Sequence, residues 1–249
     1  MVFKQIETSI IIPTKNEADH LIYTIDEIQS DLEKSNINYE IIIIDDGSFD
    51  NTALVAKQIG IDKIIRNDSS IGKINSILKI INLIESPIIV TIDADGVIDP
   101  NNIANYIRYI KENKADIILG ARYIPKYKKT NILALIFRLL NTIIYIFMKK
   151  IFRKKISIID SQTSFRVGKT ETFKKIFNQH ILSKNPSDSE LNIKLIWNNP
   201  QVIYLPVVFR LRESYGYSKK ESNSFNIIKY ILIHVISNFL NHILKGVSS

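Results

Sequence analysis

Short, continuous runs of isoleucine and valine recur along roughly the first 120 residues, and they constrain the fold more than any other feature of the sequence. The runs lie at 8–12, 40–44, 88–92 and 116–119, with a weaker one near 62–65. Uninterrupted apolar runs, as opposed to alternating ones, are typical of parallel strands buried on both faces. Segments with helical spacing separate them, at roughly 17–34, 51–59, 73–84 and 101–113. This alternation predicts right-handed βαβ units and a Rossmann-like α/β fold with a mostly parallel sheet.

A chain of 249 residues is long enough for one such domain with a buried core and a modest appendage. Hydrophobic residues make up 45% and charged residues 23%, and no repeat or low-complexity stretch is present, which argues against disordered and solenoid proteins. Cysteine is absent, which excludes disulfides, thiolate metal sites and cysteine nucleophiles and suits a reducing compartment. The first residues carry too short an apolar run for a signal peptide, so we expect none.

In a sheet of this kind the ligand crevice lies beyond the carboxyl ends of the strands. The four stronger apolar runs are followed by PTKNE at 13–17, DDGS at 45–48, DADG at 93–96 and GARY at 120–123. Three of these segments carry carboxylates and the fourth an arginine. Because parallel strands end at one edge, we expect all four segments to meet there and form a site.

Asp93 and Asp95 flank one alanine directly after an apolar run. Two carboxylates so placed can both approach Mg²⁺ or Mn²⁺, which prefer oxygen ligands and often bridge carboxylates to substrate phosphates. Such an ion would neutralise a departing diphosphate. The alternative is a polar turn before a helix that starts near Asp99 and Pro100. The position after a buried strand favours the metal site.

Asp45 and Asp46 follow the second apolar run in the same way. Carboxylates at a strand end can accept hydrogen bonds from a nucleobase N–H or from ribose hydroxyls. A turn that only introduces the next helix is the alternative, with Ser48 or Asp50 as its cap. We expect both, with Asp45 and Asp46 binding ligand and Ser48 and Asp50 capping the helix.

Four motifs, in this order, resemble those of the family 2 glycosyltransferases. They are PTKNE, IDDGSFDNT, the DADG after a strand, and DSQTSFR at 160–166. More narrowly, the chain is similar to the dolichol-phosphate mannose synthase and dolichol-phosphate glucosyltransferase branch, over roughly residues 8–220.

The resemblance implies an inverting transferase of GT-A fold that uses GDP-mannose or UDP-glucose with Mg²⁺ or Mn²⁺. It implies a donor site made of residues from several motifs. These are Pro13, Glu17, Asp45 and Asp46 at the nucleoside, Lys73, Asp93, Asp95 and Arg122 at the metal and diphosphate, and Arg212 and Lys219 in a later loop. It also implies catalytic roles for Asp95, Arg122 and Asp160, and an acceptor side with Arg138, Gln162 and Ser164.

The sequence departs from the family pattern at three places. Val97 stands where many relatives have glutamine, so water would complete the metal coordination. Ile74 replaces the second glycine of a GKG segment, which leaves the role of Lys73 open. The spacing from Arg212 to Gly216 is one residue longer than usual, which leaves Arg212 open as well.

Asp188 and Glu190 correspond to an acidic helix of the family. The alternative is an ordinary helix start, at which Ser187 and Asp188 cap and Glu190 favours the helix dipole. Both interpretations stay open from the sequence.

The segments 131–150 and 223–245 each carry a polar stripe on an otherwise apolar helical pattern. Lysines and arginines bracket the first, within a chain of net charge +8. Arg138 interrupts it, so it is poorly suited to span a membrane, whereas an interfacial helix against anionic headgroups fits. The alternative is that both helices pack on the core. We expect a catalytic domain over 1–222, with the first helix inserted, and a membrane-associated helix over 223–249.

These observations predict a hexosyltransferase that acts on a polyprenyl or dolichyl phosphate, attached peripherally to the cytoplasmic face of a membrane. A phosphate acceptor is already anionic, so it needs little help from a base. One alternative is a family 2 enzyme that extends a glycan on a hydroxyl group, with Asp160 or Asp188 as the base. Another is a nucleotide-binding module without activity. Nucleic acid is not expected as a partner, because the crevice is acidic and no basic–aromatic stacking motif is present.

Overall fold

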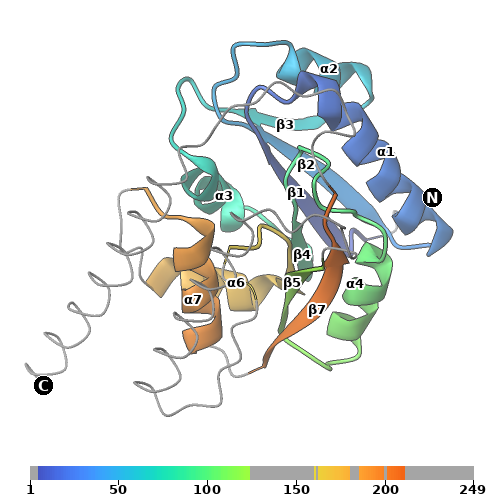
Figure 1. Ribbon diagram of the computed structural model, residues 1–249, viewed down its shortest axis with the longest axis vertical. Coiled ribbons are helices and arrows are strands. Elements are labelled where there is room, and N and C mark those ends of the chain that lie inside the picture. The colour runs from blue at the N-terminus through green and yellow to red at the C-terminus, as the bar shows by residue number, and fades with distance from the viewer. Residues whose placement is uncertain (1–4, 124–159, 161, 180–184, 199–200, 211–249) are drawn as a thin grey trace, which may run out of the picture.

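The computed structural model describes residues 5–123, 160, 162–179, 185–198 and 201–210. Over these residues the chain forms one seven-stranded sheet in the order β3-β2-β1-β4-β6-β5-β7, with helices on both faces (Figure 1). The strands are β1 Thr8–Thr14, β2 Tyr39–Asp45, β3 Lys63–Arg66, β4 Ile88–Thr91, β5 Ile117–Tyr123, β6 Arg166–Lys169 and β7 Val202–Val208. The helices are α1 Ala18–Lys34, α2 Thr52–Gln58, α3 Lys73–Ile81, α4 Ile103–Lys111, α6 Thr170–Gln179 and α7 Asp188–Asn198.

The sheet is mostly parallel, as the sequence predicts. β1 pairs in parallel with β2 and β4, β2 pairs in parallel with β3, and β5 pairs in parallel with β7. β6 is the exception, because it lies antiparallel between β4 and β5. Because β6 is antiparallel to both of its neighbours, β5 runs in the same direction as β4. The carboxyl ends of β1, β2, β4 and β5 therefore point to the same edge.

Each apolar run places its side chains on both faces of the sheet. In β1, Ile10 and Ile12 belong to one core cluster and Ile11 to the other, and all three are fully buried. α1, α2 and α4 cover the first face, while α3, α6 and α7 cover the second (Figure 1). This two-sided burial explains why the strands read as continuous hydrophobic stretches.

The segment that follows the DADG motif, residues 97–99, is joined to residues 209–210, which follow β7, by backbone and side-chain contacts. Ile98 forms a β-bridge with Phe209, and the Arg210 N–H donates to the Val97 carbonyl at 2.7 Å. The Arg210 guanidinium also pairs with Glu27 at 2.7 Å and with Asp99 at 2.8 Å. Burial lowers the pKa of Arg210, but hydrogen bonds to these two carboxylates outweigh it and raise that pKa. These contacts hold in place the segment of the chain that follows Asp95.

In the part of the chain that the structure describes, no helix is long and apolar enough to cross a membrane. The segments 131–150 and 223–245, and the expected domain boundary at 222, lie outside the described residues.

Candidate active site

A cavity of about 300 Å³ lies at the carboxyl edge of the sheet. Its lining comes from the ends of β1, β2 and β4 and from the start of α3. The lining residues are Pro13, Thr14, Lys15, Glu17, Asp46, Ser70, Gly72, Lys73, Asp93, Ala94 and Asp95. Six of the predicted donor residues therefore meet in one place, and the volume lies within the range of small-molecule sites.

Asp93 and Asp95 occupy the turn that follows β4, and both side chains are partly exposed in the cavity. Gly96, with φ +64°, closes the turn, and the Val97 N–H donates to Asp95 Oδ1 at 3.1 Å. The Thr24 hydroxyl donates to the Ala94 carbonyl at 3.0 Å, which ties the turn to α1. The two carboxylates are thus held on a fixed backbone at the edge of the sheet.

Lys73, the first residue of α3, lies between two carboxylates. Its Nζ is 3.1 and 3.2 Å from the two oxygens of Asp93 and 2.6 Å from Asp188 Oδ2. Burial alone would lower the pKa of Lys73, but the charges of Asp188 and Asp93 outweigh burial and raise it. The side chain therefore stays cationic, with its ammonium group against the cavity.

Asp188 is held from its other side by Arg166, whose side chain is fully buried in β6. Arg166 Nη2 donates to Asp188 Oδ1 at 2.7 Å, and Nε donates to Asn192 Oδ1 at 2.6 Å. Its remaining donors reach the carbonyls of Thr163 and Ser164. Burial raises the pKa of Asp188, but the two cations outweigh burial and lower it. An aspartate paired in this way is a weak proton acceptor.

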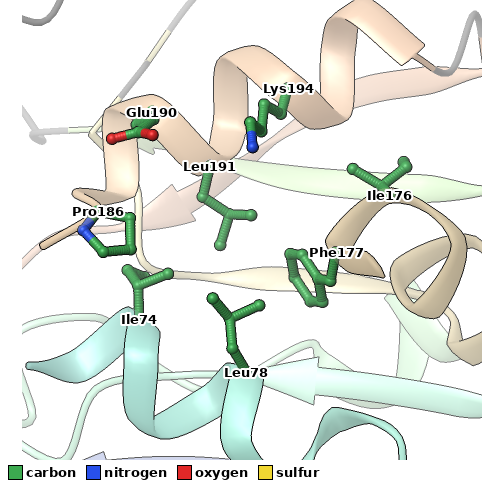
Figure 2. A pocket seen from close by; sticks show the side chains of 8 residues that line it. All are labelled: Ile74, Leu78, Ile176, Phe177, Pro186, Glu190, Leu191 and Lys194. Carbon is green, nitrogen blue, oxygen red and sulfur yellow. The ribbon is translucent and has the colours of Figure 1, made fainter. Parts of the chain in front are cut away.

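The helix-start interpretation of the segment 187–190 is correct for Ser187 and for Glu190, which lies in the first turn of α7, but not for Asp188 as a cap. The Ser187 hydroxyl oxygen accepts the Glu190 N–H at 3.2 Å, while Asp188 turns to Lys73 and Arg166. Glu190 is buried and borders a small pocket between α3, α6 and α7. Figure 2 shows that pocket, with Ile74, Phe177 and Leu191 facing one another. At about 20 Å³ it has room for little more than one water molecule, so it is a packing defect and not a ligand site.

Asp46 is a heavily hydrogen-bonded carboxylate of the cavity. Its oxygens accept the N–H groups of Ile71 and Gly72, the Asn67 amide, and the hydroxyls of Ser70 and Ser76. Burial opposes ionisation, but these hydrogen bonds outweigh it and lower the pKa of Asp46 to about 2.

Asp45, in contrast, is fully buried and does not line the cavity. Its Oδ1 accepts the Ser48 N–H at 2.8 Å, and Arg66 Nε lies 3.5 Å from its Oδ2. The two neighbouring aspartates, which the sequence treats alike, therefore have different surroundings. Asp50 accepts the Thr52 N–H at the start of α2, although Asn51 occupies the N-cap position itself. The Ser48 hydroxyl accepts the Asn16 N–H and does not cap the helix.

Of the predicted acceptor-side loop, Asp160, Gln162 and Ser164 come shortly before β6 in the chain and are not among the residues that line the cavity. Asp160 is buried, and its Oδ1 accepts the Gln162 N–H at 3.1 Å. Ser164 is also buried, and its carbonyl accepts the Thr91 hydroxyl at 3.0 Å. Arg122 lies within β5, opposite Val207. Arg138, Arg212 and Lys219 lie outside the described residues.

The sequence gives no separate role to Arg166, the last residue of the DSQTSFR motif. It also does not point to three polar residues around Asp46, namely Asn67, Ser70 and Ser76. The sequence signal for Arg166 is only that this arginine precedes a valine and a glycine. Its complete burial in the sheet is seen in the structure.

The family model described as Glycosyl transferase family 2 matches residues 9–177, which is more than half of the chain. The chain belongs to glycosyl transferase family 2. A dolichol-phosphate mannosyltransferase from Pyrococcus furiosus is 32% identical over 128 residues, which are 50% of this chain but only 36% of that enzyme. An uncharacterised protein from Methanocaldococcus jannaschii is 30% identical over 177 residues, covering 66% of this chain and 72% of that protein.

Solved structures of glycosyltransferases share the fold. Mannosyl-3-phosphoglycerate synthase from Rubrobacter xylanophilus has a TM-score of 0.68 at 15% identity, covering 95% of this chain and 75% of that chain. Glucosyl-3-phosphoglycerate synthase from Mycobacterium tuberculosis, in complex with Mn²⁺ and UDP-glucose, has a TM-score of 0.60 at 13% identity, covering 91% and 78%. The predictions of a family 2 glycosyltransferase and of a GT-A fold are both confirmed.

Proposed function

We propose that this family 2 member is an inverting hexosyltransferase that moves mannose from GDP-mannose or glucose from UDP-glucose to a polyprenyl or dolichyl phosphate. The observation that carries the acceptor class is the double ion pair at Asp188. A hydroxyl acceptor needs a carboxylate that can take its proton. Asp188, the carboxylate at the acidic helix, is held by Lys73 and Arg166 with a lowered pKa, so it is poorly suited to that task.

A phosphate acceptor removes the need for a base, because its oxygen is already anionic at neutral pH. That oxygen forms a bond to the anomeric carbon while the bond from this carbon to the diphosphate oxygen breaks. The nucleoside diphosphate leaves with the electron pair. Positioning and charge stabilisation then carry the catalysis. The name of the Pyrococcus furiosus relative, a dolichol-phosphate mannosyltransferase, supports this acceptor class.

We assign the donor to the cavity at the carboxyl edge of the sheet. Pro13 and Glu17 lie on the side proposed for the nucleoside, and Lys73, Asp93 and Asp95 on the side proposed for the diphosphate. Arg122, Arg212 and Lys219 are further candidates for diphosphate contacts, on the sequence alone. Asp160, Gln162 and Ser164 are proposed for the acceptor side.

A divalent ion fits the donor set, since Asp93 and Asp95 offer carboxylate oxygens in the cavity. Within the described ranges no group of three or more His, Cys, Asp or Glu side chains is placed to hold a metal. The two aspartates would therefore share Mg²⁺ or Mn²⁺ with water and with the donor phosphates, as is common for Mg²⁺. When bound, the ion supplies positive charge to the leaving diphosphate. The Mn²⁺ in the Mycobacterium tuberculosis synthase complex supports this proposal.

We also propose peripheral attachment to the cytoplasmic face of a membrane through 131–150 and 223–245. The support is the sequence pattern alone, a polar stripe on apolar segments with basic clusters at both ends of the first. Arg138 would hold the acceptor phosphate, because its planar fork suits a phosphate better than an ammonium group does.

The test is the chemistry of the product. GDP-mannose and UDP-glucose, each radiolabelled, are incubated with the protein, Mn²⁺ and either polyprenyl phosphate or a neutral glycan. The proposal expects a chloroform-soluble product from one donor, labile to mild acid, as a sugar phosphodiester of a polyprenol is. An alkali-stable glycan product, with no lipid-linked sugar, would overturn it.

A further inference from the structure

We propose that Arg210 is a positioning residue that holds Asp95 in place for the divalent ion, through the backbone of Val97. The proposal rests on the metal role of Asp95 in the proposed function. It names a residue outside the cavity, because the described residues that line the cavity include neither Arg210 nor its partners Glu27 and Asp99.

The orientation of the Asp95 carboxylate depends on where Val97 lies. Asp95 Oδ1 accepts the Val97 N–H at 3.1 Å, and the Val97 carbonyl accepts the Arg210 N–H at 2.7 Å. Val97 is thus held between the carboxylate proposed for the metal and a residue that follows β7. A shift of Val97 would turn the Asp95 side chain or release it.

The segment 97–99 is paired with the end of β7 by more than this one hydrogen bond. Ile98 forms an antiparallel β-bridge with Phe209, and the Asp99 N–H donates to the Val208 carbonyl at 3.0 Å. Three consecutive residues after the DADG turn therefore contact three consecutive residues at the end of β7. The two segments move together or not at all.

The Arg210 side chain attaches this pair of segments to α1. Its Nη1 lies 2.7 Å and 2.8 Å from the two oxygens of Glu27, a residue of α1, and its Nη2 lies 2.8 Å from Asp99 Oδ2. A planar guanidinium can reach two carboxylates at once in a fixed geometry, which a lysine ammonium does less well. One side chain therefore joins the segment 97–99 to a helix of the core.

The same helix holds the other side of Asp95. The Thr24 hydroxyl donates to the Ala94 carbonyl at 3.0 Å, and Glu27 follows Thr24 by three residues, so both lie on one face of α1. Asp95 and Gly96 stand between the two attachments, and Gly96 has φ +64°. Because glycine restricts the backbone little, the position of Asp95 depends on both attachments.

The consequence should appear in metal binding. A site with two carboxylates depends on how well both are aimed, and the loss of partners that orient a metal ligand typically lowers metal affinity about 10- to 100-fold. Charge alone would act in the opposite direction, since a cation near the site repels a divalent ion and its removal would tighten binding. The sign of the change therefore separates positioning from electrostatics.

The experiment measures how much Mn²⁺ contributes to nucleotide binding. The affinities of the 249-residue chain for UDP and GDP are measured by calorimetry, with saturating Mn²⁺ and without metal. The ratio of the two affinities is the contribution of the ion. In Arg210→Met this ratio should fall about tenfold, while the metal-free affinity stays within about twofold of wild type. A ratio that is unchanged or higher would overturn the proposal.

Two further variants test the route through Glu27. Arg210→Lys retains the charge but lacks the planar fork, so the ratio should fall about threefold, and a ratio equal to wild type would contradict the proposal. It replaces Arg210→Met if that variant does not fold. Glu27→Gln should also lower the ratio, and the double variant with Arg210→Met should lose no more than Arg210→Met alone. Additive losses would mean that the two residues act separately, which would contradict the proposal.

Lys169→Met is the matched control for a general loss of structure. Lys169 and Asp116 form a 2.7 Å pair of comparable exposure, and Lys169 lies opposite Ile88 at the amino end of β4, away from the carboxyl edge. Its loss should leave the Mn²⁺ contribution within about twofold of wild type, because it has no connection to the DADG turn. A fall as large as that in Arg210→Met would mean that any broken ion pair weakens metal binding, and would overturn the proposal.

Failure of the proposed function can be told apart from failure of this inference. If wild-type protein binds UDP and GDP no better with Mn²⁺ than without it, the metal role of Asp95 is wrong and the role of Arg210 falls with it, before any variant is made. If Mn²⁺ strengthens binding to wild type and Arg210→Met leaves the ratio unchanged, only the role of Arg210 is wrong. Neither measurement depends on the acceptor.

Discussion

Lys73 Nζ lies 2.6 Å from Asp188 Oδ2, so an ion pair joins the first residue of α3 to the first residue of α7. The pair continues to Asp93 on one side and to the buried Arg166 on the other. Charges therefore alternate in sign from the DADG turn into the protein interior. The arrangement explains how a fully buried arginine is tolerated in β6, since buried charges need paired and hydrogen-bonded surroundings.

Asp188→Asn should lower the free energy of unfolding by about 2 kcal/mol at neutral pH, because it leaves the buried Arg166 without its counterion. Urea denaturation measures the change. Asp116→Asn is the matched control, since it breaks a 2.7 Å pair with the more exposed Lys169 and should cost less than about 1 kcal/mol. Equal losses for the two variants would mean that the Arg166–Asp188 pair has no special role.

Asp95→Asn should remove divalent-dependent transfer and leave the fold intact, because the side chain is partly exposed and lines the cavity. The expected loss in kcat is at least about a hundredfold, as for other groups that stabilise developing charge. Transfer rates over a Mn²⁺ titration, with circular dichroism as the folding check, provide the measurement. Activity within about threefold of wild type, roughly 0.7 kcal/mol, contradicts the assignment.

Two glycines with positive φ allow a matched test of the contact between the turn at 45–48 and the loop at 67–72. At Gly60, with φ +81°, an added Cβ meets nothing within 4 Å, so Gly60→Ala should cost only the backbone strain of about 1 kcal/mol. At Gly47 the same methyl group meets the Ser69–Ser70 backbone at 3.0 Å, so Gly47→Ala should cost about 2 to 4 kcal/mol. Thermal unfolding of both variants measures the two losses of stability. Gly47→Ala no worse than Gly60→Ala would show that the loop is not packed on the turn.

The hydrogen bonds to Asp46 should make the free energy of unfolding depend on pH in the acid range. Its pKa falls from 3.8 to about 2 in the folded protein, so the ionised side chain contributes stability above the unfolded pKa. That contribution, about 2 kcal/mol, is lost as the pH falls from about 4 to about 2. The difference in unfolding free energy between wild type and Asp46→Asn should shrink over that window and stay constant above about pH 5. A difference that does not change with pH would mean that Asp46 titrates normally.

Much of the sheet could be predicted from the sequence, because strands buried on both faces need uninterrupted apolar residues. All five of the predicted apolar runs are strands. β6 could not be predicted from an apolar run, because its four residues are Arg166, Val167, Gly168 and Lys169. Its burial depends on the hydrogen-bond partners of Arg166. β7 was not predicted either, although its segment VIYLPVV is apolar apart from one tyrosine and one proline.

The site was predictable to the level of strand ends. Parallel strands place their carboxyl ends at one edge, so the meeting of Glu17, Asp46 and Asp95 follows from topology. The topology does not say which of the adjacent residues Asp45 and Asp46 faces the cavity, because this depends on the loop at 67–72. The donors in that loop carry no local signal that links them to an aspartate about 20 residues earlier.

The central claim is that the acceptor is a phosphate and needs no base. It is tested most directly by comparing transfer to polyprenyl phosphate with transfer to the matching polyprenol, at one concentration of the active donor and of Mn²⁺. The two acceptors differ only in the phosphate group. The account predicts transfer to the phosphate at a rate at least about a hundredfold above that to the alcohol, because Asp188, the carboxylate of the acidic helix, is held by Lys73 and Arg166 and is poorly suited to deprotonate a hydroxyl. Equal rates for the two acceptors would contradict it.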